Sequence, residues 1–196
     1  MLIKTVLNKC YPVKGFVYGK VTLHENKITV KIKERKGSKG LCSKCKKTAP
    51  TYDHLNERYF RFIPLWGYIV MLAYKPRRVS CPEHGVTVEL IPWAQGKSPI
   101  CEPFRIFLSH WAKYLSWQEV ARQFRVSWRN VFESVEHVIE YGLKHLNLDN
   151  INAIGIDEIQ YLKGHKYLTL VYQIDSACKR LLFVGQNSQD IVAVLY

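Results

Sequence analysis

The sequence predicts an α+β multidomain protein, and three observations support this fold class. With 196 residues and 47% hydrophobic content, the chain is long enough for two or three small domains and is not mostly disordered. Strand-like alternation dominates residues 14–92, helical spacing replaces it over residues 100–147, and strand composition returns after residue 150. Two short Cys/His motifs also lie in the first β-rich region, where a bound metal can supply folding free energy.

The two motifs, Cys42-Ser-Lys-Cys45 and Cys81-Pro-Glu-His84, are separated by 35 residues and offer paired metal ligands. Two such pairs complete the closed tetrahedral set of a structural zinc site, and thiolate with imidazole favours zinc over magnesium or calcium. Gly85 follows the second motif and permits a tight turn with positive φ. The spacing therefore predicts a small β zinc ribbon over residues 41–92.

A closed site of this kind argues against a hydrolytic metal centre. Four protein ligands leave the zinc no open position for a water molecule. His54 has no partner at motif spacing, so we expect it at the surface. The alternative interpretation of the four ligands is a set of reduced core residues that binds no metal.

Positive charge is concentrated before and around the first motif. Residues 1–50 hold 13 Lys and Arg against two acids, whereas the rest of the chain is nearly balanced, with 16 bases and 14 acids. Residues 14–35 alternate as a hairpin does, with its turn at His24-Glu-Asn. We expect a basic β-hairpin arm over residues 1–40 that contacts nucleic-acid phosphates; a solvated surface is the alternative.

Two further strands are expected between the metal motifs, at residues 58–64 and 68–74, with a break at Pro64 and Gly67. The metal is then expected to clamp a small sheet that has little core of its own. Arg77 and Arg78 lie beside the second motif. They are candidates for DNA phosphate contacts, and exposed strand residues are the alternative.

Helical spacing begins after a breaker-rich linker from Pro92 to Pro103. A first helix is predicted over residues 102–114, and Ser116-Trp-Gln-Glu119 is a capping box that begins the second helix. After a tight turn, Ser127 is a good N-cap for a longer third helix. A short helix, a short turn and a capped long helix form the helix-turn-helix pattern, which we assign to residues 100–147.

In a helix-turn-helix motif, the exposed first turn of the last helix faces the major groove of DNA. Here that turn offers four polar side chains: Arg129, Asn130, Glu133 and Ser134. Arginine can pair with guanine and asparagine with adenine, so we expect double-stranded DNA as the partner. A homodimer is compatible with the motif, which does not fix the oligomeric state.

The same periodicity predicts which helical residues are buried. The third helix is expected to bury one apolar face: Val131, Val135, Ile139 and Leu143 or Leu146. Three tryptophans are expected in the core rather than on a base-stacking surface: Trp111, Trp117 and Trp128. The alternative is a helical trio that packs but reads no DNA.

The last region predicts an antiparallel β-meander from segments 152–161, 166–174 and 180–184, which short turns connect. Asp157 lies inside the first, otherwise apolar strand. A carboxylate is costly to bury there, so we expect Asp157 to ligate a metal. Glu158 points to the opposite face and is expected to be solvated.

Taken in order, these parts resemble the ISL-three family of bacterial insertion-sequence transposases. The resemblance lies in residues 42–45, 77–85, 115–128 and 155–158, followed by Lys163-Gly-His-Lys-Tyr. It covers nearly the whole chain from about residue 40. The family runs from a zinc ribbon through a helix-turn-helix to an RNase H-like catalytic domain with an Asp-Asp-Glu triad, and it acts on the terminal inverted repeats of its element.

The resemblance implies that Asp157 is the first carboxylate of that triad and that residues 150–196 are the N-terminal fragment of the RNase H-like domain. Carboxylates from separate parts of the fold would hold two magnesium or manganese ions for strand cleavage and transfer. Asp190, on a predicted helix over residues 188–196, is not in the place of the second Asp. We therefore expect an incomplete catalytic site and a chain that is inactive alone.

Two functions follow from these expectations. One is a transposase that binds terminal inverted repeats and uses metal-dependent DNA cleavage in the complete family. The alternative is a non-catalytic, zinc-containing DNA-binding protein, either a repressor or a remnant.

No apolar run approaches the roughly 20 residues of a membrane span, and no secretory signal opens the chain. We expect a cytoplasmic, nucleoid-associated bacterial protein with reduced cysteines.

Overall fold

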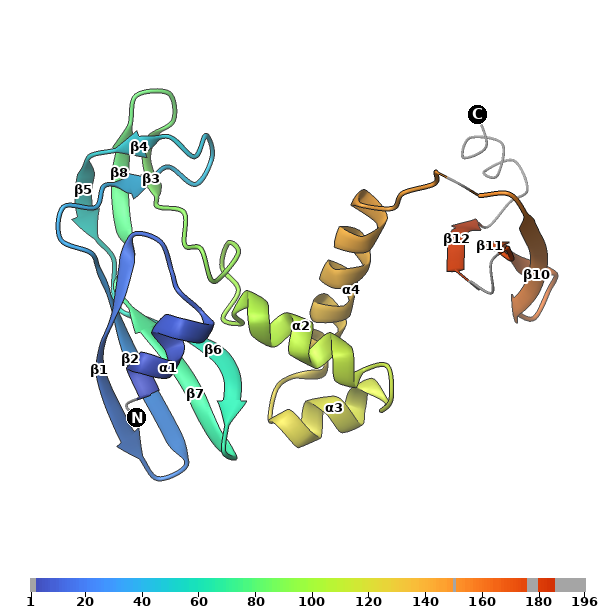
Figure 1. The fold of residues 1–196 in the computed structure, drawn as a ribbon, viewed down its shortest axis with the longest axis horizontal. Helices are drawn as coiled ribbons and strands as arrows, with labels where there is room; N and C mark the ends of the chain where they lie inside the picture. The colour runs from blue at the N-terminus through green and yellow to red at the C-terminus, as the bar shows by residue number, and fades with distance from the viewer. Residues whose placement is uncertain (1–2, 150, 176–179, 186–196) are drawn as a thin grey trace. The chain divides into compact units, whose positions relative to one another are not determined.

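A computed structural model describes residues 3–149, 151–175 and 180–185. The chain divides into two compact units, Met1–Lys144 and His145–Tyr196, and it combines strands and helices as the α+β class predicts (Figure 1). Among the described residues, no helix is both long and apolar enough to cross a membrane.

The first unit begins with helix α1 (Ile3–Cys10), followed by strands and then by three more helices in its described part. The strands are β1 (Phe16–His24), β2 (Lys27–Glu34), β3 (Gly40–Leu41), β4 (Thr48–Ala49), β5 (Thr51–His54), β6 (Arg58–Leu65), β7 (Tyr68–Tyr74), β8 (Arg77–Cys81) and β9 (Gly85–Val88). The helices are α2 (Glu102–Trp111), α3 (Trp117–Phe124) and α4 (Trp128–Lys144).

Four of these strands form the main sheet, in the order β1-β2-β7-β6. The β1–β2 hairpin turns where predicted, and β2 then pairs in parallel with β7, so that Val30 lies opposite Leu72. This pairing corrects the expectation of a separate arm over residues 1–40. Because the hairpin supplies half of the sheet, it shares one core with the strands that follow the first metal motif.

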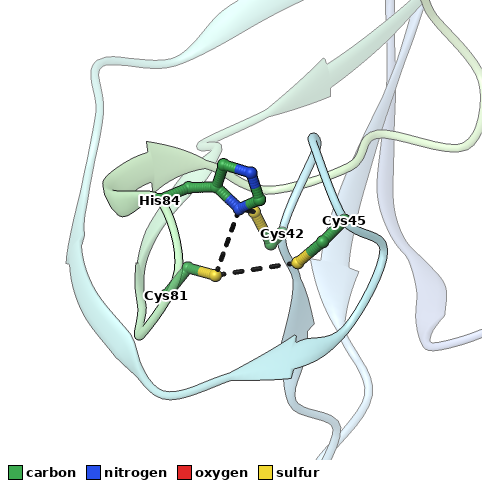
Figure 2. A group of neighbouring side chains, drawn as sticks. All are labelled: Cys42, Cys45, Cys81 and His84. Carbon is green, nitrogen blue, oxygen red and sulfur yellow. Dashed lines mark hydrogen bonds between the residues drawn. The ribbon is translucent and has the colours of Figure 1, made fainter.

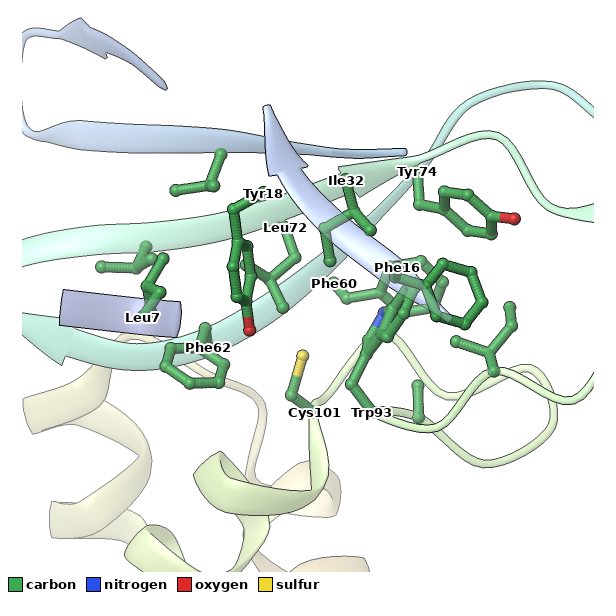
Figure 3. Close-up of a cluster of buried hydrophobic side chains, with 14 of the residues drawn as sticks. Leu7, Phe16, Tyr18, Ile32, Phe60, Phe62, Leu72, Tyr74, Trp93 and Cys101 are labelled. Atoms are coloured by element: carbon green, nitrogen blue, oxygen red, sulfur yellow. The ribbon is translucent and has the colours of Figure 1, made fainter. Parts of the chain in front are cut away.

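Alternate residues of the four strands point into that core, as the period of two requires. Trp93 lies at its centre and is fully buried (Figure 3). Its indole makes edge-to-face contacts with Phe16, Tyr74 and Phe60, at centroid distances of 4.9, 5.3 and 6.0 Å. Such pairs contribute about 0.5–1.5 kcal/mol beyond the area they bury. The predicted linker is therefore part of the core, which also contains Ala94 and Cys101, while Ile100 is buried in the separate core of the helices that follow.

The remaining strands form what we call the metal-ligand module: a β3–β4 pair and a small sheet in the order β5-β8-β9. Its buried core consists of four small side chains, Cys42, Ala49, Val79 and Cys81. The predicted strands at residues 58–64 and 68–74 lie in the main sheet instead, so the metal motifs do not clamp them. The expectation of a module with little core of its own still fits the metal-ligand module.

Helices α2, α3 and α4 form the helical module, which packs around Phe104, Leu108, Val120 and Val131. The predicted capping box is confirmed: the Ser116 hydroxyl accepts a hydrogen bond from the Glu119 N–H, and the Glu119 carboxylate accepts one from the Ser116 N–H. The third helix is capped as expected, because the Asn130 N–H donates to the Ser127 hydroxyl at 3.1 Å.

The buried face of α4 is shorter than predicted. Val131 is fully buried, but Ile139 and Leu143 are 55% and 61% exposed. The reason is length, since α2 has ten residues and α4 has seventeen, and the buried residues of α4 lie in its first half. Trp128 is also half exposed rather than in the core, and Trp111 is partly exposed.

The second unit contains β10 (Ile154–Leu162), β11 (Lys166–Gln173) and β12 (Arg180–Gly185), which pair in that order as an antiparallel meander. The predicted meander is thus confirmed. Gly164 and His165 take positive φ in the turn between β10 and β11. The predicted terminal helix and Asp190 lie outside the described residues.

The capping box predicts a measurable stability effect. Replacing Ser116 by alanine removes the side-chain acceptor for the Glu119 N–H, so Ser116→Ala should destabilise the folded chain by about 1 kcal/mol. Ser116→Thr keeps the hydroxyl and should cost less. Urea unfolding of the two variants tests this, and equal stability of Ser116→Ala and the unmodified chain would contradict it.

Candidate metal centre and nucleic-acid interface

The four predicted metal ligands come together from two turns. Cys42 and Cys45 lie in the turn between β3 and β4, while Cys81 ends β8 and His84 precedes β9 (Figure 2). The second turn is tight because Cys81 pairs directly with Gly85, which takes φ +66° as predicted.

The four ligand atoms all lie within 4.8 Å of one another. The Cys45 and Cys81 sulfurs are 3.7 Å apart, and Nδ1 of His84 lies 3.6 Å from the Cys81 sulfur and 3.9 Å from that of Cys42. A tetrahedral zinc with Zn–S bonds of about 2.3 Å and Zn–N bonds of about 2.0 Å needs S···S and S···N edges of about 3.5–3.8 Å. The donor set and its spacing therefore fit a structural zinc ion.

Hydrogen bonds prepare the Cys42 sulfur for a metal. The Thr87 hydroxyl lies 3.5 Å from it, and backbone N–H groups of Cys45 and Lys44 also reach it. These contacts, the Thr87 hydroxyl first, hold the pKa of Cys42 at about 6, well below the usual value for a thiol. Since the thiolate is the metal ligand, the contacts favour binding. Sequence reasoning did not identify Thr87, because a threonine in a strand gives no metal signal by itself.

Arg77 is part of the structural support of this centre and not a surface cation. Its side chain is 5% exposed and that of Glu89 is 1% exposed. Arg77 Nε and Nη2 donate to the Glu89 carboxylate at 2.9 and 2.7 Å, and Nη1 donates to the carbonyl of Ser38 at 3.0 Å. The predicted phosphate contact of Arg77 is thus corrected, because a buried and paired guanidinium does not reach DNA.

The Glu89 carboxylate also accepts a hydrogen bond from the Tyr74 hydroxyl of the main sheet. The ion pair therefore connects the metal-ligand module to the main sheet. Arg78, one residue further along β8, remains at the surface, where it pairs with Asp53 and lies over the ring of Tyr52. A DNA phosphate would have to replace Asp53 as its partner.

Gly40, in β3, allows the strands of the module to approach one another closely. A Cβ at this position would lie 2.6 Å from Cγ1 of Val79, and Glu89 and Arg77 are also within 4 Å. Only a residue without a side chain fits there. Sequence reasoning did not identify Gly40, because the need for glycine there comes from a contact with Val79, a residue 39 positions away.

The first turn of α4 presents some of its predicted DNA-binding residues to solvent. Arg129 is 82% exposed and donates to the Glu133 carboxylate at 2.8 Å, one helical turn away. Asn130 is half-buried. Ser134 is a correction: it is buried, its hydroxyl donates to the carbonyl of Asn130, and its own carbonyl accepts from Ser109 of α2. It stabilises the α2–α4 contact and cannot read a base.

An aromatic cluster lies beside this turn. The rings of Trp117, Trp128 and Phe132 pack within 5.6–5.9 Å of one another, the last two nearly parallel. Trp128 and Phe132 are partly exposed in the cluster. The cluster is therefore a surface feature of the helical module as well as part of its packing.

Asp157 is exposed on β10, opposite Leu170 of β11, and its carboxylate accepts from the Glu158 N–H at 2.8 Å. We expected Asp157 to be buried in an apolar strand and therefore to need a metal; because its side chain is exposed, that argument is wrong. Glu158 is solvated as expected. Among the described residues, the Cys/His cluster is the group whose geometry suits a metal, and Asp157 is not part of it.

Metal removal should act locally. Chelation of the metal should abolish hydrogen-exchange protection of the β3, β4, β8 and β9 amides while protection persists in β1, β2 and β7, because the Trp93 core does not depend on the metal.

Cys81→Ser should lower zinc affinity by more than the roughly 10–100-fold that outer-shell changes cost. Cys10→Ser, which alters an exposed cysteine outside the cluster, should keep one zinc per chain; its loss would contradict the assignment.

Gly40 gives a second prediction. The Cβ of Gly40→Ala would overlap Val79, so the variant should lose about 1–3 kcal/mol of unfolding free energy in the metal-loaded state. Gly142→Ala, in the last turn of α4, is the matched control, since no atom lies within 4 Å of the added Cβ. It should be neutral or stabilising by up to about 1 kcal/mol. Denaturant unfolding would refute the packing argument if both variants behaved alike.

Comparison with known proteins gives a consistent set of relatives. The chain is 32% identical over 153 residues to the transposase for insertion sequence element IS1557 from two strains of Mycobacterium tuberculosis, which covers 76% of this chain and 34% of that protein. It is 24% identical over 146 residues to the transposase for insertion sequence element IS1001 from Bordetella parapertussis, covering 74% and 36%.

No protein-family model matches the chain. No solved structure matches it either. The chain spans about a third of the length of the curated relatives that it matches. Over three quarters of its own length, it is homologous to insertion-sequence transposases.

Proposed function

We propose that the chain contributes to transposition of an insertion sequence of the ISL-three type, by binding the terminal inverted repeats of the element. The observation that carries this proposal is the similarity to two named transposases over about three quarters of the chain. These names do not favour the alternative of a non-catalytic binding protein. Because chromosomal DNA would be the partner, we place the protein with the bacterial nucleoid.

The main sheet supports a contact with DNA phosphates. Inward-pointing Ile28, Val30 and Ile32 alternate along β2 with exposed lysines. These lysines are Lys27, Lys31 and Lys33. A row of cations on one face of a sheet neutralises phosphates without reading sequence. In this proposal the sheet and the metal-ligand module, a zinc ribbon, supply general affinity for DNA.

The helical module is proposed to supply sequence preference as a helix-turn-helix. Arg129 supports this assignment because it is highly exposed on the first turn of α4. Its ion pair with Glu133 is exposed, and exposed ion pairs contribute little to stability. Replacing the Glu133 carboxylate by the edge of a guanine base therefore costs Arg129 little free energy. Asn130 is half-buried, directly before the buried Val131 of α4. It is the second candidate for a base contact.

The second unit is proposed to be the start of an RNase H-like catalytic domain. Asp157, exposed at the middle of β10, would be one of the carboxylates that hold two magnesium or manganese ions. The order of the strands, an antiparallel meander that begins with the strand carrying Asp157, is compatible with this role. Among the described residues, Asp157 does not belong to a group of three or more possible metal ligands.

Gel-shift titration with duplex DNA tests the binding proposal. The chain should prefer a duplex carrying the terminal repeat over a random duplex at moderate salt. Arg129→Ala should reduce that preference roughly 10- to 100-fold, because a bidentate base contact is worth about 1–3 kcal/mol. Lys144→Ala, which removes a charge at the other end of α4, should keep it. Equal affinity of the unmodified chain for both duplexes would overturn the proposal.

A further inference from the structure

A cleft lies between the turn that joins β6 to β7 and the end of α3, and both segments belong to the first unit. Its volume is about 270 Å³, and its lining includes Arg61, Gly67, Tyr68, Gln123, Phe124 and Arg125. It contains two guanidinium groups and no acidic residue. The cleft is separate from the metal cluster.

Backbone hydrogen bonds and two side-chain contacts hold Arg61 at this cleft. Its backbone N–H donates to Pro99 at 2.6 Å, and its carbonyl accepts from Cys101 at 2.9 Å. Its side chain donates from Nη2 to the carbonyl of Phe124 at 3.0 Å and lies over the ring of Phe104. The guanidinium is therefore held in one position before any ligand binds, which lowers the entropic cost of binding.

The positive charge in the cleft is not neutralised by the protein. Within the described part of the chain, neither Arg61 nor Arg125 forms an ion pair, and Nε of Arg61 is buried without a hydrogen-bond partner. Burial, and then the charge of Arg125, lower the pKa of Arg61. Buried donors without a partner are rare in proteins, and a cleft lined by two arginines and no acidic residue suits an anionic ligand.

The backbone of Arg125 supplies an independent observation. Arg125 has φ 51° and ψ 51°, the left-handed conformation, at the C-terminal cap of α3. The N–H groups of Arg125 and Val126 donate to the carbonyls of Arg122 and Ala121, which is the Schellman pattern. Glycine or asparagine is the usual residue at this place, because a Cβ is disfavoured there. An arginine that keeps this strained conformation points to a use for its side chain.

We propose that Arg61 and Arg125 together bind a phosphate group of the DNA backbone in this cleft. The proposal rests on the proposed DNA-binding function and names one contact within it. Arginine forks match phosphate oxygens in bidentate geometry. Arg125 precedes the first turn of α4, so a phosphate bound here would flank the bases proposed for Arg129. Such a contact would fix the register of α4 on the duplex without reading sequence.

Arg125→Gly in the full, zinc-loaded chain is the decisive variant. Glycine suits the left-handed cap, so the melting temperature should stay equal or rise. Affinity for random and terminal-repeat duplexes should fall alike, by roughly tenfold, the factor expected for loss of one charge-assisted hydrogen bond. The slope of log affinity against log salt should decrease by about 1. Lys144→Ala, which removes the same charge elsewhere, should change neither quantity.

A second measurement follows the Nε–H signal of Arg61 by NMR during titration with random duplex DNA or with inorganic phosphate. Random duplex should shift this signal in the unmodified chain and shift it less in Arg125→Gly. A shift with inorganic phosphate but none with duplex would assign the cleft to free phosphate and overturn the proposal. Unchanged duplex affinity and salt slope in Arg125→Gly would also overturn it.

These outcomes separate this inference from the broader proposal. If the chain shows no preference for terminal repeats but Arg125→Gly still weakens random-duplex binding with a smaller salt slope, the phosphate site stands and the proposed sequence recognition fails. If the preference is present and Arg125→Gly has no effect on affinity or salt slope, the proposed sequence recognition stands and the phosphate site fails.

Discussion

The arrangement of the metal-ligand module depends on one buried ion pair, between Arg77 and Glu89. Both side chains are almost fully buried, and the Glu89 carboxylate also receives the Tyr74 hydroxyl from the main sheet. Removal of one member of such a pair leaves an uncompensated charge at a cost of roughly 3–5 kcal/mol. The pair therefore sets the position of β8 relative to β7, and with it the position of Cys81 relative to Cys42. This junction therefore supports the arrangement in which the four metal ligands meet.

Arg61 provides the corresponding junction between the main sheet and the helical module. The segment that reaches α2 pairs with Arg61 through both backbone groups, and the side chain of the same residue meets α3. A chain that reads as separate domains in sequence is thus one compact unit up to Lys144. Any nucleic-acid surface on the sheet and any on the helices then belong to the same compact unit.

Local signals in the sequence predicted the metal ligands, the helix caps and the meander. Cys42, Cys45, Cys81 and His84 lie at spacings that chemistry restricts, and Ser116 and Ser127 act within three residues of their partners. Non-local relations were not predictable. The parallel pairing of β2 with β7, the burial of Arg77 by Glu89 and the space required at Gly40 depend on residues brought together only by folding. The exposure of Ile139 and Leu143 likewise depends on the length of α2, which a helical pattern in α4 does not encode.

The close approach of the Cys45 and Cys81 sulfurs has a consequence for redox chemistry. At 3.7 Å they are in contact but not bonded, and a two-electron oxidant would have to join them at the disulfide S–S length of about 2.05 Å. A metal ion that occupies the cluster keeps both sulfurs as ligands and blocks this reaction. Without the metal, oxidation competes with metal rebinding, and the disulfide would leave only two of the four ligands. The geometry that completes the metal site also makes the metal-free chain sensitive to oxidants.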